Sequence, residues 1–195
     1  MCQQFSPVNI IDLVFLCEPV YTPIPIFFET QGLCTMSFRI GVISDTHLKS
    51  VTKEFRQIYD EFLADKDLII HAGDIVCEDV IDFLSHKPLK AVCGNMDPFE
   101  LRKRLLPKET FEVEGFTIGV IHGWGPPAGL EERILSEMPH ADVIVYGHSH
   151  HPANKPREGV LMFNPGTATG YPSAGFNSIG LLEITDKVEG KIIKI

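Results

Sequence analysis

The sequence is most constrained by short apolar runs, rich in β-branched residues, that each stop at a cluster of Gly, Asp, Asn or His. The first run, Phe38–Ile43, leads into Asp45-Thr46-His47. Four further clusters repeat the pattern: Gly73-Asp74, Gly94-Asn95-Met96-Asp97, His122-Gly123 and Tyr146-Gly147-His148-Ser149-His150. A buried strand that feeds a loop gives this pattern, so we expect strands over 38–43, 67–70, 89–93, 116–121 and 142–146.

Helical patterns separate these runs. Residues 51–63 carry apolar side chains at helical spacing with charged residues between them, which predicts an amphipathic helix. Further helices are expected over 80–84, from Asp97 to before Pro107, and over 129–137. Asp97-Pro98-Phe99-Glu100 has the form of a helix start with Asp97 as the N-cap.

The end of the chain is richer in strands. Residues 111–113 and 116–121, joined through Glu114-Gly115, have the pattern of a hairpin. Residues 160–163, 178–184 and 187–194 are expected to form antiparallel strands. Alternating strands and helices followed by a β-rich end predict an α/β layered fold, with two sheets packed face to face and helices outside.

Composition limits the class of partner. With 195 residues, 44% hydrophobic and 22% charged, the chain suits one domain with a substantial core. The formal charge of −9 argues against sequence-independent binding to nucleic acid, which needs clustered Lys and Arg. Bound cations would offset part of this charge, so a small phosphorylated substrate is compatible with it. Five cysteines without a C-x-x-C pair fit free thiols, and we expect a cytoplasmic protein.

Residues 1–35 differ from the rest of the chain. Val8–Phe28 is apolar, but Asp12, Glu18 and three prolines interrupt it, so neither a membrane helix nor a continuous amphipathic helix fits. No Lys or Arg precedes the apolar part, which argues against a secretory signal. We therefore expect an N-terminal extension over 1–35 to which the sequence assigns no structure, and no membrane association. Two explanations stay open, a start site at Met36 and a docking tail.

The side chains at the strand ends are of the kinds that bind metals. Asp, His and Asn offer oxygen and imidazole donors that suit Mn²⁺, Fe, Zn²⁺ or Ni²⁺ better than Ca²⁺ or copper. His148 and His150 stand on alternate residues of an extended turn, so both rings point the same way. Loops at the carboxyl ends of strands converge above a sheet, which predicts one shared metal site. The alternative is a set of turn formers and buried histidines without any ligand role.

The order of these motifs carries a resemblance to a known family. The succession D-x-H, G-D, G-N-x-D, H-G and G-H-x-H resembles the calcineurin-like metallophosphoesterases, and most of all their small single-domain phosphodiesterase branch with G-N-x-D as third motif. The resemblance covers residues 38–195 and implies a calcineurin-like phosphoesterase domain over 36–195. It implies a four-layer αββα sandwich of two mixed β-sheets flanked by helices. Asn164-Pro165-Gly166-Thr167 is similar to the N-P-G-S stretch that borders the site in this branch.

The resemblance also implies ligands for two divalent metal ions. Asp45, His47 and His150 would hold the first ion, Asn95, His122 and His148 the second, and Asp74 would bridge both. Mn²⁺ is the expected metal, with Ni²⁺, Zn²⁺, Fe or Co²⁺ as alternatives. Asp74, Asn95 and His122 also form the expected catalytic set with Asp97, for which helix capping is an equal alternative.

These roles predict a dinuclear phosphoesterase, and more narrowly a phosphodiesterase, that hydrolyses a small phosphate ester by attack of a metal-bridging hydroxide. Met96 stands where many relatives carry a histidine that protonates the leaving group. Because a thioether supplies no proton, esters with good leaving groups should react best. The expected partner is a small phosphorylated substrate. Nothing in the sequence indicates nucleic-acid binding, and the oligomeric state stays open.

Alternatives follow from the same resemblance. A phosphomonoesterase, a nucleotide pyrophosphatase or a nuclease would use the same metals on another ester. A non-catalytic scaffold of the Vps29 type would use the same architecture to bind proteins. Such scaffolds depart at some of the ligand histidines, whereas this chain keeps the whole set, so an enzyme is the prediction.

Overall fold

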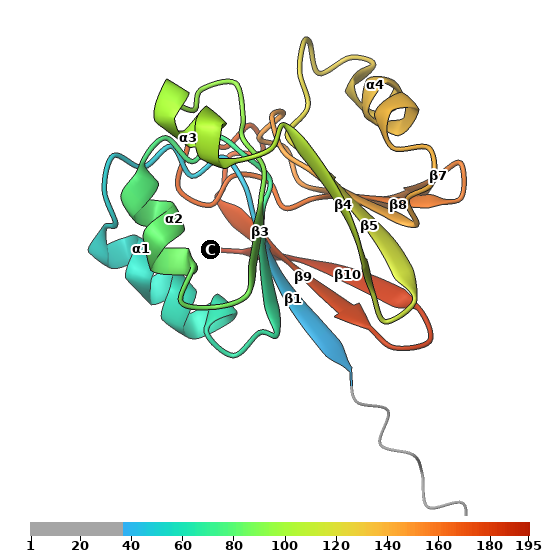
Figure 1. The fold of residues 1–195 in the computed structure, drawn as a ribbon, viewed down its shortest axis with the longest axis horizontal. Helices are drawn as coiled ribbons and strands as arrows, with labels where there is room; N and C mark the ends of the chain where they lie inside the picture. Colours follow the sequence, from blue (N-terminus) through green and yellow to red (C-terminus); the bar gives the residue numbers. More distant parts are fainter. Residues whose placement is uncertain (1–36) are drawn as a thin grey trace, which may run out of the picture. The chain divides into compact units, whose positions relative to one another are not determined.

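The computed structural model describes residues 37–195, whose fold is drawn in Figure 1. The N-terminal extension expected over residues 1–35 lies outside the described residues. Within the described part, two five-stranded sheets are flanked by helices. This arrangement confirms the predicted α/β sandwich of two mixed sheets.

The first sheet has the strand order β10-β9-β1-β2-β3, so the two ends of the described chain meet in it. Its members are β1 (Phe38–Ile43), β2 (Leu68–His71), β3 (Leu89–Ala91), β9 (Ser178–Ile184) and β10 (Val188–Lys194). β1, β2 and β3 run parallel, with Ile40 opposite Leu68. β9 is antiparallel to both β1 and β10. The three parallel strands therefore end at one edge of the sheet.

The second sheet has the order β4-β5-β6-β8-β7. Its members are β4 (Lys108–Val113), β5 (Phe116–Ile121), β6 (Val143–Tyr146), β7 (Ala153–Arg157) and β8 (Val160–Asn164). β4 and β5 form the predicted hairpin, whose turn places Glu114 and Gly115 at positive φ. The expectation that 160–163 is wholly antiparallel is wrong, because β8 runs parallel to β6 and antiparallel only to β7. The sequence did not predict β7, because Pro156 and its charged neighbours are atypical of a strand and are tolerated only at a sheet edge.

Helices cover the outer face of each sheet (Figure 1). α1 (Lys53–Ile58), the π-helical turn η1 (Tyr59–Leu63) and α2 (Glu78–Leu84) pack on the first sheet, and α4 (Leu130–Glu137) packs on the second. The predicted helix over 51–63 is thus α1 continued by η1, and it starts where Thr52 Oγ1 accepts from Phe55 N at 3.2 Å. α3 (Phe99–Arg104) is a short helix after β3. No helix within residues 37–195 is long and apolar enough to cross a membrane.

The core between the sheets fixes their distance. Side chains from both sheets interdigitate there, including Ile40, Val42, Val120, Val145 and Leu182, all of them buried. Phe163 on β8 is fully buried and lies against Gly180 on β9 and Gly190 on β10. A side chain at either glycine would overlap the Phe163 ring, so these glycines are required by close packing.

We expect Gly180→Ala to lower the free energy of unfolding by about 1–3 kcal/mol, because its methyl group would collide with the Phe163 ring inside a closed core. Denaturant unfolding of the single variants and of the double variant with Phe163→Leu measures the coupling. The smaller side chain should relieve much of the collision, so the cost of Gly180→Ala should shrink in the Phe163→Leu background. Additive costs would contradict this packing.

Candidate metal centre

The loops that follow five strands meet on one face of the sandwich. Asp45 and His47 follow β1, Asp74 follows β2, Asn95 follows β3, His122 follows β5, and His148 and His150 follow β6. The loops are tied to each other, since Asp45 N donates to Gly73 O at 3.0 Å and His47 N to Asp74 O at 3.1 Å. The hydrogen bond from His148 N to Asp45 Oδ2, 3.1 Å long, joins the two sheets. All seven sequence-predicted ligands therefore belong to one connected loop cluster.

One group of donor atoms includes the carboxylates of Asp45 and Asp74. Asp45, His47, Asp74 and His150 each offer an atom, and these four atoms lie within 4.8 Å of one another. Asp45 Oδ1 lies 3.1 Å from His150 Nε2 and 3.9 Å from both His47 Nε2 and His122 Nε2. Asp74 Oδ2 lies 3.3 Å from His122 Nε2 and 3.8 Å from His47 Nε2. Asp74 is thus between the two histidines, as a shared ligand would be.

Two buried atoms of this group have no hydrogen-bond partner among residues 37–195. They are Asp45 Oδ1 and His122 Nε2; the 3.1 Å contact of Asp45 Oδ1 with His150 lacks hydrogen-bond geometry. The other oxygen, Asp45 Oδ2, accepts from Ser44 Oγ at 2.6 Å and from His148 N. A buried polar atom without a partner costs free energy, and a cation between these atoms would satisfy both. The donor set therefore fits a divalent metal.

The outer nitrogen atoms of two histidines fix which nitrogen faces the centre. His122 Nδ1 lies 2.7 Å from Ala72 O, and His150 Nδ1 lies 2.7 Å from Tyr171 O. A carbonyl oxygen only accepts, so each Nδ1 carries the hydrogen. In the neutral ring the lone pair is then on Nε2, the atom that points to Asp45 and Asp74. Backbone carbonyls orient metal-binding histidines in this way.

A second pair of donors lies beside His122. The ring of His148 is 5.3 Å from that of His122, and its Nε2 lies 2.8 Å from Gly125 O, to which it must donate. The neutral ring leaves a lone pair on His148 Nδ1, which faces Asn95 Oδ1 at 2.9 Å. Two electron-pair donors in contact repel each other unless a proton or a cation lies between them. This pair fits a cation for the same reason as the Asp45 group.

Backbone strain is concentrated in these loops. Five of the seven predicted ligands have positive φ values between 49° and 69°: Asp45, His47, Asp74, His148 and His150. Residues other than glycine adopt this left-handed region at a cost of about 1–3 kcal/mol each, and they are held there mainly at functional sites. The strain is therefore a second, independent sign that the cluster has a function.

Asp97 holds two of the loops together. Its Oδ1 accepts from Ile75 N and Val76 N, both at 2.7 Å, and its Oδ2 accepts from Gly94 N at 2.8 Å. The expectation that Asp97 caps a helix is wrong, because Pro98 is the N-cap of α3 and has no side-chain hydrogen bond. Both oxygen atoms are occupied by backbone donors from the Asp74 and Asn95 loops. Asp97 is therefore a positioning residue in this structure.

The stretch Asn164–Thr167 supports loops that follow strands of both sheets. Asn164 Nδ2 donates to Gly147 O at 2.9 Å, and Thr167 Oγ1 donates to Asp45 O at 2.7 Å. The family resemblance implied that this stretch borders the site, and the structure has it in contact with the Gly147 and Asp45 backbone. Two arginines were missed. Arg102 and Arg133 bind backbone carbonyls of site loops through long side chains, a contact that leaves no pattern in sequence.

Opposite charges outweigh burial at the centre. Burial lowers the pKa of His122, but contact with Asp74 and the charges of Asp45 and Asp74 raise that pKa above its ordinary 6.5. Asp45 likewise raises the pKa of His150, against the effect of burial. Burial raises the pKa of Asp74, yet His122 and Met96 N–H bring that pKa below 3.8. In the metal-free protein, His122 and His150 therefore keep a proton that a cation must displace.

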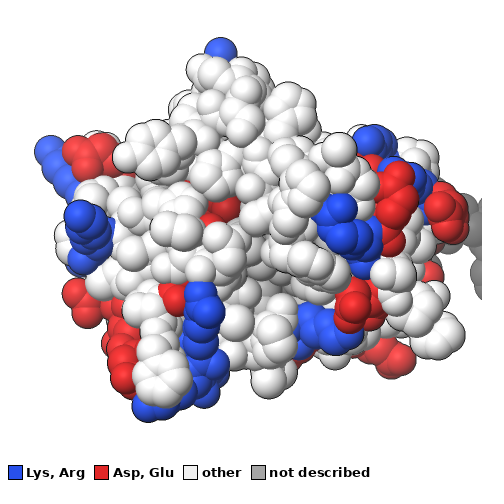
Figure 2. All heavy atoms as spheres, turned by 90° about the horizontal axis from the view of Figure 1, so that it is seen from above, with Lys and Arg blue, Asp and Glu red and all other residues white. Residues whose placement is uncertain are grey.

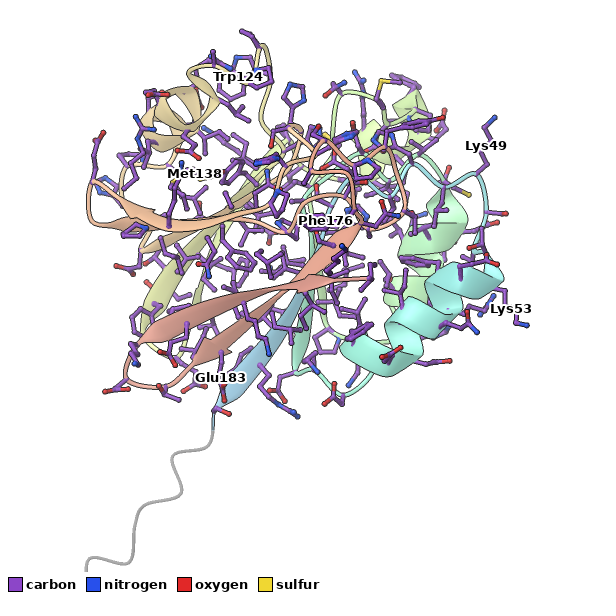
Figure 3. The ribbon with its side chains drawn as sticks, turned by 180° about the vertical axis from the view of Figure 1, so that it is seen from behind. Lys49, Lys53, Trp124, Met138, Phe176 and Glu183 are labelled. Atoms are coloured by element: carbon purple, nitrogen blue, oxygen red, sulfur yellow. The ribbon has the colours of Figure 1, made fainter. Side chains whose placement is uncertain are left out.

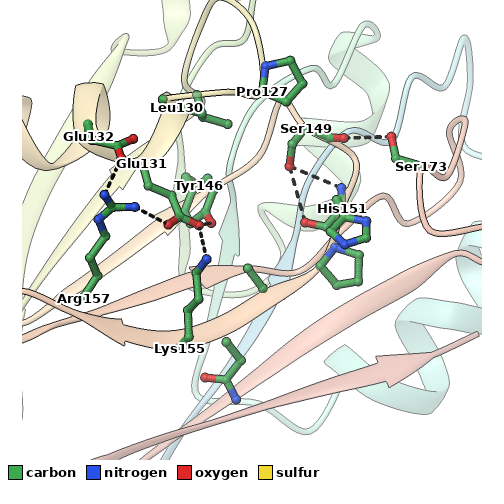
Figure 4. A pocket seen from close by; sticks show the side chains of 14 residues that line it. Pro127, Leu130, Glu131, Glu132, Tyr146, Ser149, His151, Lys155, Arg157 and Ser173 are labelled. Atoms are coloured by element: carbon green, nitrogen blue, oxygen red, sulfur yellow. Dashed lines mark hydrogen bonds and ion pairs between the residues drawn. The ribbon is translucent and has the colours of Figure 1, made fainter.

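Two cavities adjoin the loops. The larger, about 650 Å³, lies behind the histidine loop and is lined by Ser149 and His151, which alternate with His148 and His150 (Figure 4). Its cations are neutralised, since Lys155 and Arg157 pair with Glu131 at 3.1 and 3.0 Å. The smaller cavity, about 400 Å³, is walled in part by Asn95 and His122. Only the smaller one opens onto predicted ligands, so it is the better candidate for a substrate site.

The loop face has little charge near its middle. Figure 2 views the molecule from the side of the loops, and its Lys and Arg residues gather at the margins around a pale centre with a small acidic area. Attraction of an anion by a basic surface is therefore weak here. An anion would have to be attracted by cations held at the centre itself.

Comparison with known proteins gives three findings. The calcineurin-like phosphoesterase superfamily domain matches residues 38–187. The probable metallophosphoesterase MJ0623 of Methanocaldococcus jannaschii is 40% identical over 161 aligned positions, and the match covers 80% of this chain and 81% of the relative. The phosphodiesterase MJ0936 of the same organism is 28% identical over 170 residues, covering 80% of this chain and 98% of the relative.

A solved structure shares the fold. Vacuolar Protein Sorting 29 from Cryptosporidium parvum superposes with a TM-score of 0.64 over 82% of this chain and 98% of its own, at 21% identity. At this identity the likeness concerns the fold alone.

Asp97→Asn should weaken the hydrogen bonds that hold the Asp74 and Asn95 loops, without changing any predicted ligand. The substitution replaces one acceptor oxygen by an NH₂ group that faces backbone N–H donors, so we expect the free energy of unfolding to fall by about 1.5–3 kcal/mol. Affinity for Mn²⁺ should fall with it. Asp60→Asn, at an exposed position of η1, is the matched control and should change stability by less than about 0.5 kcal/mol. Equal stabilities for the two variants would contradict a positioning role.

Metal uptake should weaken as the pH falls. His122 and His150 have raised pKa values, so each holds its proton at pH 6 and must release it to bind a cation. We expect Mn²⁺ affinity to drop by about tenfold or more between pH 8 and pH 6. Calorimetric titration in buffers of different ionisation enthalpy counts the protons released. Affinity that is independent of pH, with no proton release, would exclude ligation by these imidazoles.

Proposed function

The chain belongs to the calcineurin-like phosphoesterase superfamily, as its motif order predicts, and from this premise we propose that it is a dinuclear metal-dependent phosphodiesterase acting on a small phosphorylated substrate. Family membership supports hydrolysis of a phosphoric ester with a divalent metal. The preference for diesters is the finer part of the proposal, and the named phosphodiesterase relative at 28% identity supports it.

The observation that carries the proposal is the pair of buried, unpartnered atoms Asp45 Oδ1 and His122 Nε2. We assign Asp45, His47 and His150 to one cation, and Asn95, His122 and His148 to the other. Asp74 serves both, since its Oδ2 lies between His47 and His122. Mn²⁺ is proposed because mixed oxygen and imidazole donors suit it, although Ni²⁺, Zn²⁺, Fe and Co²⁺ accept the same donors.

When bound, two divalent cations lower the pKa of water and neutralise charge on a phosphate. The protein residues keep that site in order. Asp74 supplies a shared negative charge, fixed by Met96 N, which donates to its Oδ1 at 2.7 Å. Asn95 adds an oxygen donor without adding charge. Ala72 O and Tyr171 O hold His122 and His150 in the tautomer whose free nitrogen faces inward.

The leaving group receives little help from residue 96. Met96 is 59% exposed, and its thioether has no proton to give. General acid catalysis contributes typically about 10²–10⁴-fold to a rate, so its absence at this position selects for esters whose alcohol is already acidic. We therefore expect aryl esters to outpace alkyl esters.

A non-catalytic scaffold is the second candidate, because the Vps29 structure shares the fold. A protein-binding scaffold does not need a complete set of metal ligands. The strained loops and unpartnered atoms of this chain, which would be costly without a metal, favour the enzyme. Hydrolysis of a monoester or of a nucleotide pyrophosphate remains the alternative among enzymes.

With Mn²⁺ or Ni²⁺ added, the purified protein should hydrolyse bis-p-nitrophenyl phosphate faster than p-nitrophenyl phosphate. Asp74→Asn removes the shared charge and His122→Ala a ligand, so each should abolish both activities, a loss of at least about 10³-fold. His86→Ala, at an exposed position, is the matched control and should keep the parent rate. Release of p-nitrophenolate measures all four proteins.

The outcomes separate the candidates. Faster turnover of the monoester would replace the diesterase by a monoesterase with the metal site intact. The scaffold would be favoured if neither ester is hydrolysed with Mn²⁺ or Ni²⁺ and the protein keeps less than one metal ion per chain after dialysis.

A further inference from the structure

A separate compartment adjoins the predicted second metal position. It is the 400 Å³ cavity, whose lining combines Asn95 and His122 with the apolar residues Pro107, Ile121 and Trp124. Cavities that hold small molecules typically have about 300–1,000 Å³, apolar walls and a few polar groups. This one has the right size, and a molecule inside it would be next to two predicted metal ligands.

Trp124 supplies the broad aromatic surface of the cavity. It is the chain's one tryptophan, it is 43% exposed, and it lies on the loop between β5 and α4 (Figure 3). An indole ring that lines a cavity can stack against a flat ligand group while its polar edge stays in water. Together with the apolar walls of Pro107 and Ile121, it offers a flat group a face to stack on.

The loop of Trp124 is held in place by Arg133. The guanidinium of this α4 residue donates to Trp124 O through Nε at 3.1 Å and Nη2 at 2.9 Å, and to Ala128 O through Nη1 at 3.1 Å. It also donates to Pro126 O. Three carbonyls of one loop are thus bound by one side chain. Such a loop presents its aromatic residue with little entropy left to lose on binding.

One positively charged side chain of the cavity, Arg102, lies beside Asn95. Arg102 lines the cavity and donates to Asp97 O at 2.8 Å and to Asn95 O. Its charge is thereby fixed beside the Asn95 loop. The other cation, Lys108, is neutralised by Glu137 Oε2 at 2.6 Å. An anionic phosphate is therefore favoured beside Asn95 and Arg102, and an uncharged group is favoured against the apolar lining residues.

We propose that this cavity binds the planar aromatic substituent of the phosphate ester, a nucleobase or an aryl ring, by stacking on Trp124. The substrate class is then an aromatic phosphate ester, which agrees with the need for an acidic leaving group at a centre without a proton donor at residue 96. The proposal rests on the proposed function for the position of the phosphate. The stacking site itself is independent of turnover.

Binding of AMP and of ribose 5-phosphate, which differ by the base, tests the stacking site. In the Mn²⁺-loaded full chain, AMP should quench the fluorescence of Trp124 with saturation, and ribose 5-phosphate should not. Calorimetry should give AMP the tighter binding by about tenfold, as stacking of one base on an aromatic side chain provides. Phenyl phosphate distinguishes the two kinds of aromatic group. An affinity equal to that of AMP indicates a general aryl site, and a weaker affinity indicates a nucleobase site.

Variants make the test specific. Trp124→Leu should remove the advantage of AMP over ribose 5-phosphate, and Trp124→Phe should retain most of it. Phe99→Leu is the matched control, because Phe99 is 69% exposed and does not line the cavity, and it should keep the full advantage. Equal melting temperatures show that all variants are folded.

Failure of this proposal is distinct from failure of the proposed function. Equal affinities of AMP and ribose 5-phosphate for the parent protein, or an AMP advantage that survives Trp124→Leu, would overturn the stacking site even if diesters are hydrolysed. AMP binding that depends on Trp124, in a protein that hydrolyses no ester, would uphold the site and refute the enzyme.

Discussion

Two carboxylates, Asp45 and Asp74, lie almost fully buried among imidazole rings, and the arrangement of the loops depends on them. Burying a charge costs several kcal/mol unless opposite charge compensates for it. In the metal-free protein the compensation comes from His122 and His150, whose pKa values rise for that reason. Cations would supply it more completely, because they would also satisfy the two atoms that now lack partners. The same electrostatic demand therefore accounts for the raised pKa values and for a donor set that fits a divalent cation.

Holding such a centre requires support from outside it. Strand ends of both sheets contribute. Hydrogen bonds accepted by Asp97 and donated by Asn164 and Thr167 fix loops whose backbone is in the left-handed region. The strain at five ligand positions has to be repaid by the packed sheets beneath. The glycine at position 94 shows how close the loops are, since any side chain there would overlap Asp74. A rigid scaffold with strained loops is the usual way to hold reactive groups in place.

Sequence alone predicted the layers and which loop side chains come together, because both leave local signals; their roles as ligands stay a prediction. β-branched runs ending in Asp, Asn or His mark strands and loops at once, and the order of the motifs identifies a family. What it missed has no local signal. The edge strand β7 contains Pro156, which is atypical of a strand. The parallel pairing of β8 depends on its neighbour β6. The positioning role of Asp97 depends on backbone donors from another loop. Arg133 and its carbonyl contacts likewise join segments through tertiary structure.

The most direct test is anomalous diffraction from crystals grown with Mn²⁺, which locates each ion against the side chains. A dinuclear centre requires two peaks per chain, one beside Asp45, His47 and His150 and one beside Asn95, His122 and His148, with Asp74 in contact with both. Two ions at the distance typical of such sites, about 3.5–4 Å, would agree with it. A single peak, or peaks away from Asp74, would contradict the claim that the buried carboxylates exist to hold a metal pair.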